Sequence, residues 1–189
     1  MHSVWKTSIR FTIVTTILLG LGYPLFVTGI AALIFPHQAA GSLILKDGQV
    51  IGSSLLAQSF TSDRYFHPRP SAAGNGYDAQ NSGGSNLAQS SKALVDRIQA
   101  SIDKLAQENP GKPVPIDMVT TSGSGLDPDI TPDAAEFQIP RIVKARTGIS
   151  VDRIRQLIAQ HTASRQLGVL GEPRVNVLEL NLDLDKLAK

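Results

Sequence analysis

The sequence contains no cysteine, which excludes disulfide bonds and thiolate chemistry anywhere in the chain. The absence does not identify a compartment, because oxidising compartments permit disulfides without requiring them. The four histidines, His2, His37, His67 and His161, are scattered and lack the spacing of metal ligands. Zinc sites need three or four converging ligands, so the sequence predicts no metal centre.

Catalytic motifs are missing as well. The chain has no G-x-S-x-G elbow, no H-E-x-x-H helix, no Walker A lysine loop and no G-x-G-x-x-G fingerprint. These absences do not disprove an enzyme, but they lower the expectation of one. We therefore predict no catalytic residues in this chain.

A long apolar run near the N-terminus is the clearest feature that is present. Residues 11–35 carry no charged side chain, and as a helix they would be roughly 37 Å long. A hydrocarbon core is about 30 Å thick, so this helix could cross it with some tilt. Gly20, Gly22, Pro24 and Gly29 interrupt the run, which a membrane helix packed against a partner tolerates.

A cleaved signal peptide is the alternative interpretation of this run. Its apolar core would be only about 7–15 residues long and would end at a small-x-small site. The run is longer than that, and the candidate cleavage site places His37 or Gln38 where a small residue is needed. A retained membrane anchor is therefore favoured.

The charges that flank the anchor predict its orientation. Lys6 and Arg10 precede it, while Lys46 and Asp47, the first charges after it, cancel. The positive-inside rule then places the short N-terminus in the cytoplasm. The expected division is a cytoplasmic N-terminus over 1–10, a transmembrane helix over 11–35 and a periplasmic, that is extracytoplasmic, domain over 36–189.

The outer portion is electrically neutral. Without Lys6 and Arg10, the eighteen Lys and Arg of the chain fall to sixteen, against sixteen Asp and Glu. A neutral domain offers no electrostatic footprint for nucleic acid or for an anionic membrane surface. We predict no nucleic-acid partner.

The outer portion mixes strand and helix patterns, which predicts a single α+β domain whose strand order the sequence leaves open. Asp47-Gly48 between two short apolar runs predicts a hairpin, and a polar, irregular segment follows over 62–85. The next expected elements are a helix that begins near Leu87 and ends at the turn signal Asn109-Pro110-Gly111, and a short strand over 114–121. A helix from Thr131-Pro132-Asp133 to about Arg146, a helix from Ser150, and a half-buried, alternating strand over 178–184 complete the expected elements.

The stretch Ser82-Gly83-Gly84 is one candidate ligand loop. It precedes the helix expected near Leu87, and free N–H groups at a helix start can bind an anion. A loop with a helix cap is the alternative and is favoured. The segment YFHPRPSA, 65–72, is equally open between a preset surface for a partner and a packed loop with buried aromatics.

The stretch TTSGSGLDPDIT, 120–131, is the second candidate loop. As a calcium loop it lacks the central glycine and the terminal glutamate, and its two prolines would stiffen it. As a phosphate cradle it would place Asp127 and Asp129 beside an anion that they repel. A shaped turn followed by a helix start is the favoured interpretation.

Taken in order, several segments resemble the small C subunit of the Kdp-type bacterial potassium-transporting P-type ATPase. They are Gly41-Ser42-Leu43-Ile44 after the anchor, YFHPRPSA (65–72), SGGSN (82–86), SGSGLDPDIT (122–131), RIVKAR (141–146) and GEPRVNVLELNLDLD (171–185).

The resemblance implies a non-catalytic accessory subunit of an ATP-driven, high-affinity potassium uptake pump in the bacterial inner membrane. Its implied partners are the ion-conducting subunit, the ATP-hydrolysing subunit and a small single-span subunit. The family is described as a catalytic chaperone that raises the ATP affinity of the hydrolysing subunit, with no tightly bound cofactor and ATP reached through the complex.

The resemblance also implies a nucleotide contact at Ser82, Gly83 and Gly84, which would make the chain a direct nucleotide-binding chaperone. The predicted orientation opposes this alternative, because it places Ser82 outside while ATP is cytoplasmic. Any effect on ATP affinity would then pass through the membrane helices.

Overall fold

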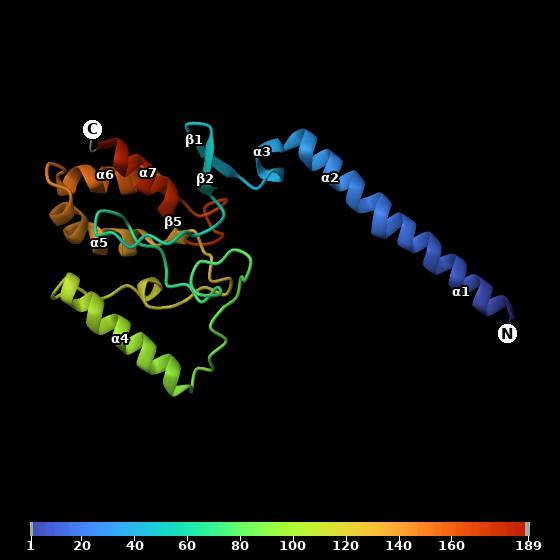
Figure 1. The fold of residues 1–189 in the computed structure, drawn as a ribbon, viewed down its shortest axis with the longest axis horizontal. Helices are drawn as coiled ribbons and strands as arrows, with labels where there is room; N and C mark the ends of the chain where they lie inside the picture. Colours follow the sequence, from blue (N-terminus) through green and yellow to red (C-terminus); the bar gives the residue numbers. More distant parts are fainter. Residues whose placement is uncertain (1, 188–189) are drawn as a thin grey trace. The chain divides into compact units, whose positions relative to one another are not determined.

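The structure is a computed structural model that describes residues 2–187. Contacts within the chain divide it into two compact units, Met1–Ile51 and Gly52–Lys189, and each is described by itself. The first unit is one long helix followed by a hairpin. The second combines helices with a small sheet (Figure 1).

The long helix consists of α1 (His2–Thr15), a π-helical segment (Thr16–Gly22) and α2 (Tyr23–Ile34). Its part from Ser3 to Ile34 contains an 18-residue window with a mean hydropathy of 2.1 and is long and apolar enough to cross a membrane. This confirms one N-terminal helix of membrane-spanning length and composition.

The π-helical segment lies directly before Pro24. A proline has no N–H to donate, and in an α-helix its ring meets the carbonyl four residues earlier, here that of Gly20. In the structure the Tyr23 N–H donates to Leu18 O, five residues back, so the helix widens before the proline. Such local π turns let a helix contain a proline without ending.

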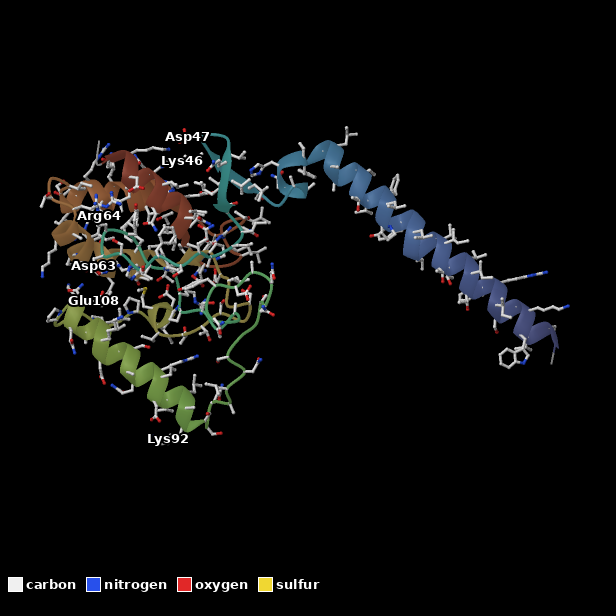
Figure 2. All side chains as sticks on the ribbon, in the orientation of Figure 1. Lys46, Asp47, Asp63, Arg64, Lys92 and Glu108 are labelled. Carbon is white, nitrogen blue, oxygen red and sulfur yellow. The ribbon has the colours of Figure 1, made fainter. Side chains whose placement is uncertain are left out.

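A short helix, α3 (Pro36–Ala39), is followed by the predicted hairpin of β1 (Leu43–Lys46) and β2 (Gln49–Ser53). Its turn residues have positive φ angles, 53° at Asp47 and 79° at Gly48. Figure 2 marks Asp47 at this turn. Two consecutive positive φ angles define the tight turn that an Asp-Gly pair favours, so this prediction is confirmed.

The second unit contains a three-stranded antiparallel sheet in the order β3-β5-β4. Ile130 on β3 lies opposite Val175 on β5, and Val175 lies opposite Thr162 on β4. The elements of this unit are α4 (Lys92–Glu108, its ends labelled in Figure 2), the 3-10 turn Ile116–Met118, β3 (Asp129–Ile130), α5 (Pro132–Ala145), α6 (Val151–His161), β4 (Thr162–Ala163), β5 (Arg174–Asn176) and α7 (Val177–Leu187).

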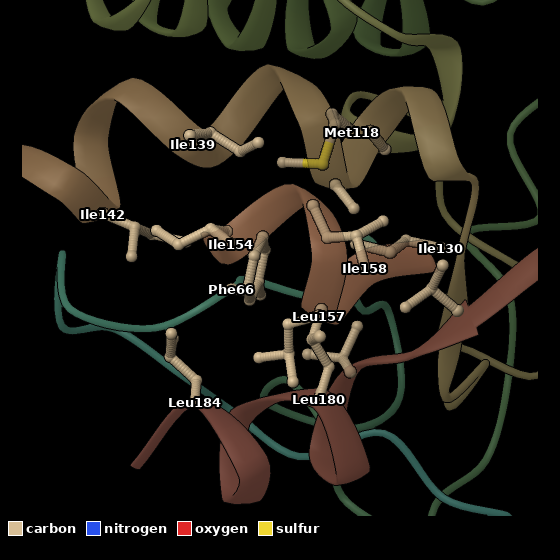
Figure 3. Packing of buried hydrophobic residues seen from close by; sticks show 14 of the residues in the cluster. Phe66, Met118, Ile130, Ile139, Ile142, Ile154, Leu157, Ile158, Leu180 and Leu184 are labelled. Atoms are coloured by element: carbon tan, nitrogen blue, oxygen red, sulfur yellow. The ribbon is translucent and has the colours of Figure 1, made fainter. Parts of the chain in front are cut away.

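The core lies between α5, α6 and α7. Figure 3 shows Phe66, which comes from the irregular segment, between side chains of these three helices. The Phe66 side chain is fully buried, as are Ile142 on α5 and Ile154 on α6. Burying each large apolar side chain contributes roughly 1.5–3 kcal/mol, so this layer is the main source of stability in the unit.

Two helix starts are confirmed in detail. The Ala134 N–H donates to Thr131 Oγ1 at 3.1 Å, and the Arg153 N–H donates to Ser150 Oγ at 3.2 Å. These are the side-chain caps that Thr and Ser supply at the N-terminus of a helix. The helix α5 ends at Ala145, next to the predicted Arg146.

The strand predicted over 178–184 is wrong, because this segment is helix α7. The buried positions Val177, Leu180, Asn181 and Leu184 follow the spacing of one helical face rather than alternation. The start of the helix carries a cap, since the Glu179 N–H donates to the side chain of Asn176. An Asn followed three residues later by Glu is a helix-start signal that competes with the alternating pattern.

Two further predictions differ from the structure, one in the type of element and one in the start of a helix. The 114–121 segment forms a 3-10 turn over Ile116–Met118 instead of a strand. Pro113 and Pro115 lack the N–H groups that a strand would use for pairing. The helix expected from Leu87 begins at Lys92, so the residues after Gly84 remain loop.

The irregular segment that carries Phe66 is fixed by the side chain of Asn181. The Phe66 N–H donates to Asn181 Oδ1 at 2.8 Å, and Asn181 Nδ2 donates to Phe66 O at 2.9 Å. Asn181 is only 2% exposed, so both backbone groups of Phe66 are satisfied inside the core.

Replacing Asn181 with Leu is expected to lower the free energy of unfolding by about 2–4 kcal/mol, because it leaves the buried N–H and C=O of Phe66 unpaired. The measurement is urea unfolding of the full chain in detergent, followed by circular dichroism. Gln160→Leu, an exposed change on α6, is the control and should stay within about 0.5 kcal/mol. Equal stability of both variants would contradict the role of Asn181.

Candidate functional site

The predicted loop Ser82-Gly83-Gly84 packs against residues 122–125, and we call this pairing the glycine-loop contact. The Gly83 N–H donates to Ser124 O at 2.8 Å, and the Ser82 hydroxyl donates to the same oxygen at 3.0 Å. The structure thus brings together the two glycine-rich stretches that the sequence analysis treated separately.

Close backbone approach explains two of the glycines in this contact. A Cβ on Gly84 would lie 3.1 Å from Gly123 O. A Cβ on Gly125 would lie 2.6 Å from Gly83 O and 2.7 Å from Ala73 N, and the φ of Gly125 is +66°. Only glycine combines that φ with such an approach.

An anion site was considered for this loop because the loop was expected to precede a helix directly. The structure does not have that arrangement. Helix α4 begins at Lys92, so Ser82-Gly83-Gly84 does not lie at a helix N-terminus. The Gly83 N–H is already donated within the chain. The nucleotide contact at these residues stays a prediction from family resemblance.

The carboxylates of the second stretch are paired with arginines. Asp127 Oδ2 lies 2.9 Å from Arg69 Nη1, and Asp129 Oδ2 lies 3.0 Å from Arg174 Nε. Asp127 Oδ1 also accepts the Asp129 N–H. Burial raises the pKa of Asp129, although the charge of Arg174 opposes the shift. The contacts are those of a shaped turn, as the sequence analysis favoured.

The YFHPRPSA segment is a packed loop rather than a free surface. Gln138 accepts the His67 N–H at 2.8 Å and donates to His67 O at 3.1 Å. Arg146 donates to Arg64 O at 2.7 Å and lies over the Tyr65 ring, 4.9 Å from its centroid. Burial and the nearby charge of Arg141 lower the pKa of His67, which favours its neutral form.

Sequence reasoning missed the residues that hold this loop, although a signal for them exists. Ala134, Gln138, Ile142 and Arg146 recur every four residues, so they lie along one face of α5 from its first turn to the residue just after its end. Gln138 is 1% exposed and Arg146 is 3% exposed. Polar side chains on an apolar stripe indicate buried hydrogen-bonding partners.

A cavity of about 690 Å³ in the second unit lies beside α5. Apolar side chains such as Val114, Phe137 and Val151 line much of it. Its buried carboxylate, Asp117, accepts the Thr131 N–H at 2.8 Å, so this group positions the start of α5. The lining residues include no serine, histidine or cysteine, and the hydroxyl of Thr131 accepts the Ala134 N–H as the cap of α5.

Within residues 2–187, no three His, Cys, Asp or Glu side chains converge as metal ligands. The polar groups described above contact other parts of the same chain.

A family model described as "K+-transporting ATPase, c chain" (KdpC) matches residues 5–186. The chain belongs to the KdpC family. The potassium-transporting ATPase KdpC subunit of Koribacter versatilis is 57% identical over 179 residues, which cover 95% of this chain and 92% of that protein. The KdpC subunit of Acidobacterium capsulatum is 56% identical over 183 residues, covering 96% and 97%.

A third KdpC subunit, from Methylobacterium nodulans, is 56% identical over 185 residues and covers 92% of each chain. The matches therefore include both the long N-terminal helix and the second unit. The family that the ordered motifs resembled is confirmed across nearly the whole sequence.

Gly125→Ala is expected to lower the free energy of unfolding by about 3 kcal/mol, because the new Cβ meets two backbone atoms and the positive φ is strained. Gly123→Ala is the matched control two residues away, since its Cβ would meet nothing within 4 Å. Chemical unfolding of both variants in detergent measures the difference. A similar loss in both variants would show that the glycine-loop contact is not formed as described.

Proposed function

We propose that this chain is a non-catalytic accessory subunit of an ATP-driven potassium uptake pump. The observation that carries the proposal is the match to KdpC subunits of potassium-transporting ATPases over almost its full length. The buried polar side chains support a scaffold role, because Gln138, Arg146 and Asn181 hold backbone of the same chain.

The proposed placement is a single-pass protein of a bacterial inner membrane. Residues 1–10 lie in the cytoplasm, the helix over 11–35 spans the membrane, and 36–189 form the periplasmic domain. Lys6 and Arg10 before the span support this orientation through the positive-inside rule.

The proposed partners are the ion-conducting subunit, the ATP-hydrolysing subunit and a small single-span subunit. The glycines of the spanning helix support a clamp between such partners. A Cβ at Gly29 would meet nothing within 4 Å, and those at Gly20 and Gly22 would make only ordinary contacts. The helix itself does not need these glycines, whereas close packing of a second helix does.

The chain then raises the ATP affinity of the hydrolysing subunit indirectly, by favouring one arrangement of the membrane helices. Such coupling requires only that ATP binding and the arrangement of the membrane helices are linked equilibria. This subunit does not need to contact ATP. The alternative, direct nucleotide binding at Ser82, Gly83 and Gly84, requires this loop to face the cytoplasm. Its internal hydrogen bonds to Ser124 give the loop a structural use instead.

Labelling of a single exposed cysteine distinguishes the indirect effect on ATP affinity from direct nucleotide binding. In this cysteine-free chain, Ala79→Cys places a thiol near Ser82, and a membrane-impermeant maleimide is expected to label it in intact spheroplasts. The control, Ser3→Cys, should be protected until the membrane is breached. The reverse pattern would place the second unit in the cytoplasm and favour direct nucleotide binding.

Replacing Gly20, Gly22 and Gly29 together with Leu is expected to reduce co-purification with the ATP-hydrolysing subunit at least tenfold, because larger side chains separate packed helices. The matched control replaces the same three with Ala, which keeps most of the close approach and should retain the complex. Affinity purification from membranes gives the ratio of subunits. Full retention in the Leu variant would rule out the clamp.

A further inference from the structure

The cavity beside α5 carries a buried carboxylate oxygen that the fold leaves without a partner. Asp117, in the 3-10 turn, lines this cavity and is only 7% exposed. Its Oδ2 accepts the Thr131 N–H at 2.8 Å, whereas its Oδ1 has no hydrogen-bond donor within residues 2–187. A buried acceptor that stays unsatisfied costs free energy, and a donor from outside the chain would recover that cost.

The cavity is large enough for a small molecule. Its volume of about 690 Å³ lies within the range of roughly 300–1,000 Å³ that is usual for ligand sites. An apolar cavity of about 150 Å³ already holds a benzene molecule. One side chain inserted by another protein would therefore leave most of this cavity unfilled, whereas a separate molecule with an extended body could fill it.

The walls of the cavity determine the body of such a molecule. The apolar side chains of Val114, Phe137 and Val151 line it. Hard metal cations take several oxygen ligands at once, and within the described residues no three carboxylate or histidine side chains converge. The expected ligand is therefore organic, with a hydrocarbon part against these walls and a polar group at Asp117.

The charges of the cavity favour a cation. Its charged side chains are Lys112, Asp117, Asp133, Glu136 and Arg155. Glu136 and Arg155 form an ion pair with each other, with 2.5 Å between Oε1 and Nη2. The two carboxylates that remain outnumber the lysine, so the cavity repels an anion and attracts a cation. An ammonium group also supplies the hydrogen-bond donor that Asp117 Oδ1 lacks.

We propose that this cavity binds an organic cation, an amine with an aliphatic body. The ammonium group donates to Asp117 Oδ1, and the hydrocarbon part packs against Val114, Phe137 and Val151. A hydrogen bond between two charged groups is roughly twice as strong as one between neutral groups, so the amine is favoured over an alcohol of the same length. All of these groups belong to one chain, so the inference does not depend on the proposed function.

The first test measures the binding of n-hexylamine to the full chain in a nonionic detergent by isothermal titration calorimetry. The heat of each ligand in detergent alone is subtracted. We expect a dissociation constant of about 1 mM or lower, which is ordinary for a ligand of this size. 1-Hexanol should bind about tenfold more weakly, and hexanoate should not bind, because neither carries an ammonium group. No binding of the amine, or equal binding of the alcohol or the anion, overturns the proposal.

The second test is Asp117→Asn. Its amide oxygen can still accept the Thr131 N–H, so the Tm should change by no more than about 3 °C, while an NH₂ group replaces the oxygen that the ligand needs. The affinity for hexylamine is expected to fall about tenfold or more. The matched control, Asp152→Asn, removes the same charge from an exposed position outside the cavity and should bind within about twofold of the wild type. Equal losses in both variants would show that only net charge attracts the amine, which overturns the proposal.

A second variant keeps the proposal testable if Asp117→Asn does not fold. Val151→Phe fills part of the cavity and leaves Asp117 in place. It is expected to weaken the binding of hexylamine about tenfold or more while the Tm stays the same or rises. Wild-type affinity of this variant would contradict the proposed position of the hydrocarbon part.

A segment of a partner protein is the competing occupant, and the assembled pump separates the two. Hexylamine is titrated into the wild-type pump and into the pump that carries Asp117→Asn. The two titrations should differ as they do for the isolated chain. Loss of that difference on assembly would assign the cavity to a partner segment and overturn the inference. Failure of the chain to join the pump would instead overturn the proposed function, and the result for the isolated chain would stand.

Discussion

The second unit depends on one constraint: irregular backbone that crosses a core must still have its hydrogen bonds satisfied. Phe66 is fully buried but belongs to neither a helix nor a strand. Its backbone is therefore paired by a side chain, Asn181 of α7, and the next residue is paired by Gln138 of α5. These contacts fix the loop and tie α5 to α7 through it. The apolar layer of Figure 3 can close only because these polar partners are supplied from the helices around it.

The same constraint accounts for the glycine-loop contact. Two loops without regular structure lie so close that Gly83 and Ser124 share a backbone hydrogen bond, and the neighbouring glycines leave room for it. Arg69 fixes the adjacent turn through Asp127. Motifs rich in glycine and carboxylates are thus used for packing loops in this chain.

Elements with local causes could be predicted from the sequence. The helix starts at Thr131 and Ser150 and the Asp47-Gly48 turn depend on neighbours in the chain, and each was found where it was expected. The strand prediction for 178–184 was wrong because the leucines of this segment fit both the alternation of a strand and the spacing of a helix. Burial of Asn181 in the core favoured the helix. The partners of Phe66 and of Gly83 are far away in sequence, 115 residues in the case of Asn181, so no local pattern shows them.

Two local features of the chain are not explained by its own fold. The N-terminal helix contains glycines whose Cβ positions would meet nothing or make only ordinary contacts, and Leu167, exposed in the turn before β5, has a conformation suited to glycine. Both features lower the intrinsic stability of a lone chain. A protein that worked alone would have no physical reason to keep either. A subunit has one, because packing against a neighbour can recover in the assembly what each residue costs in the monomer.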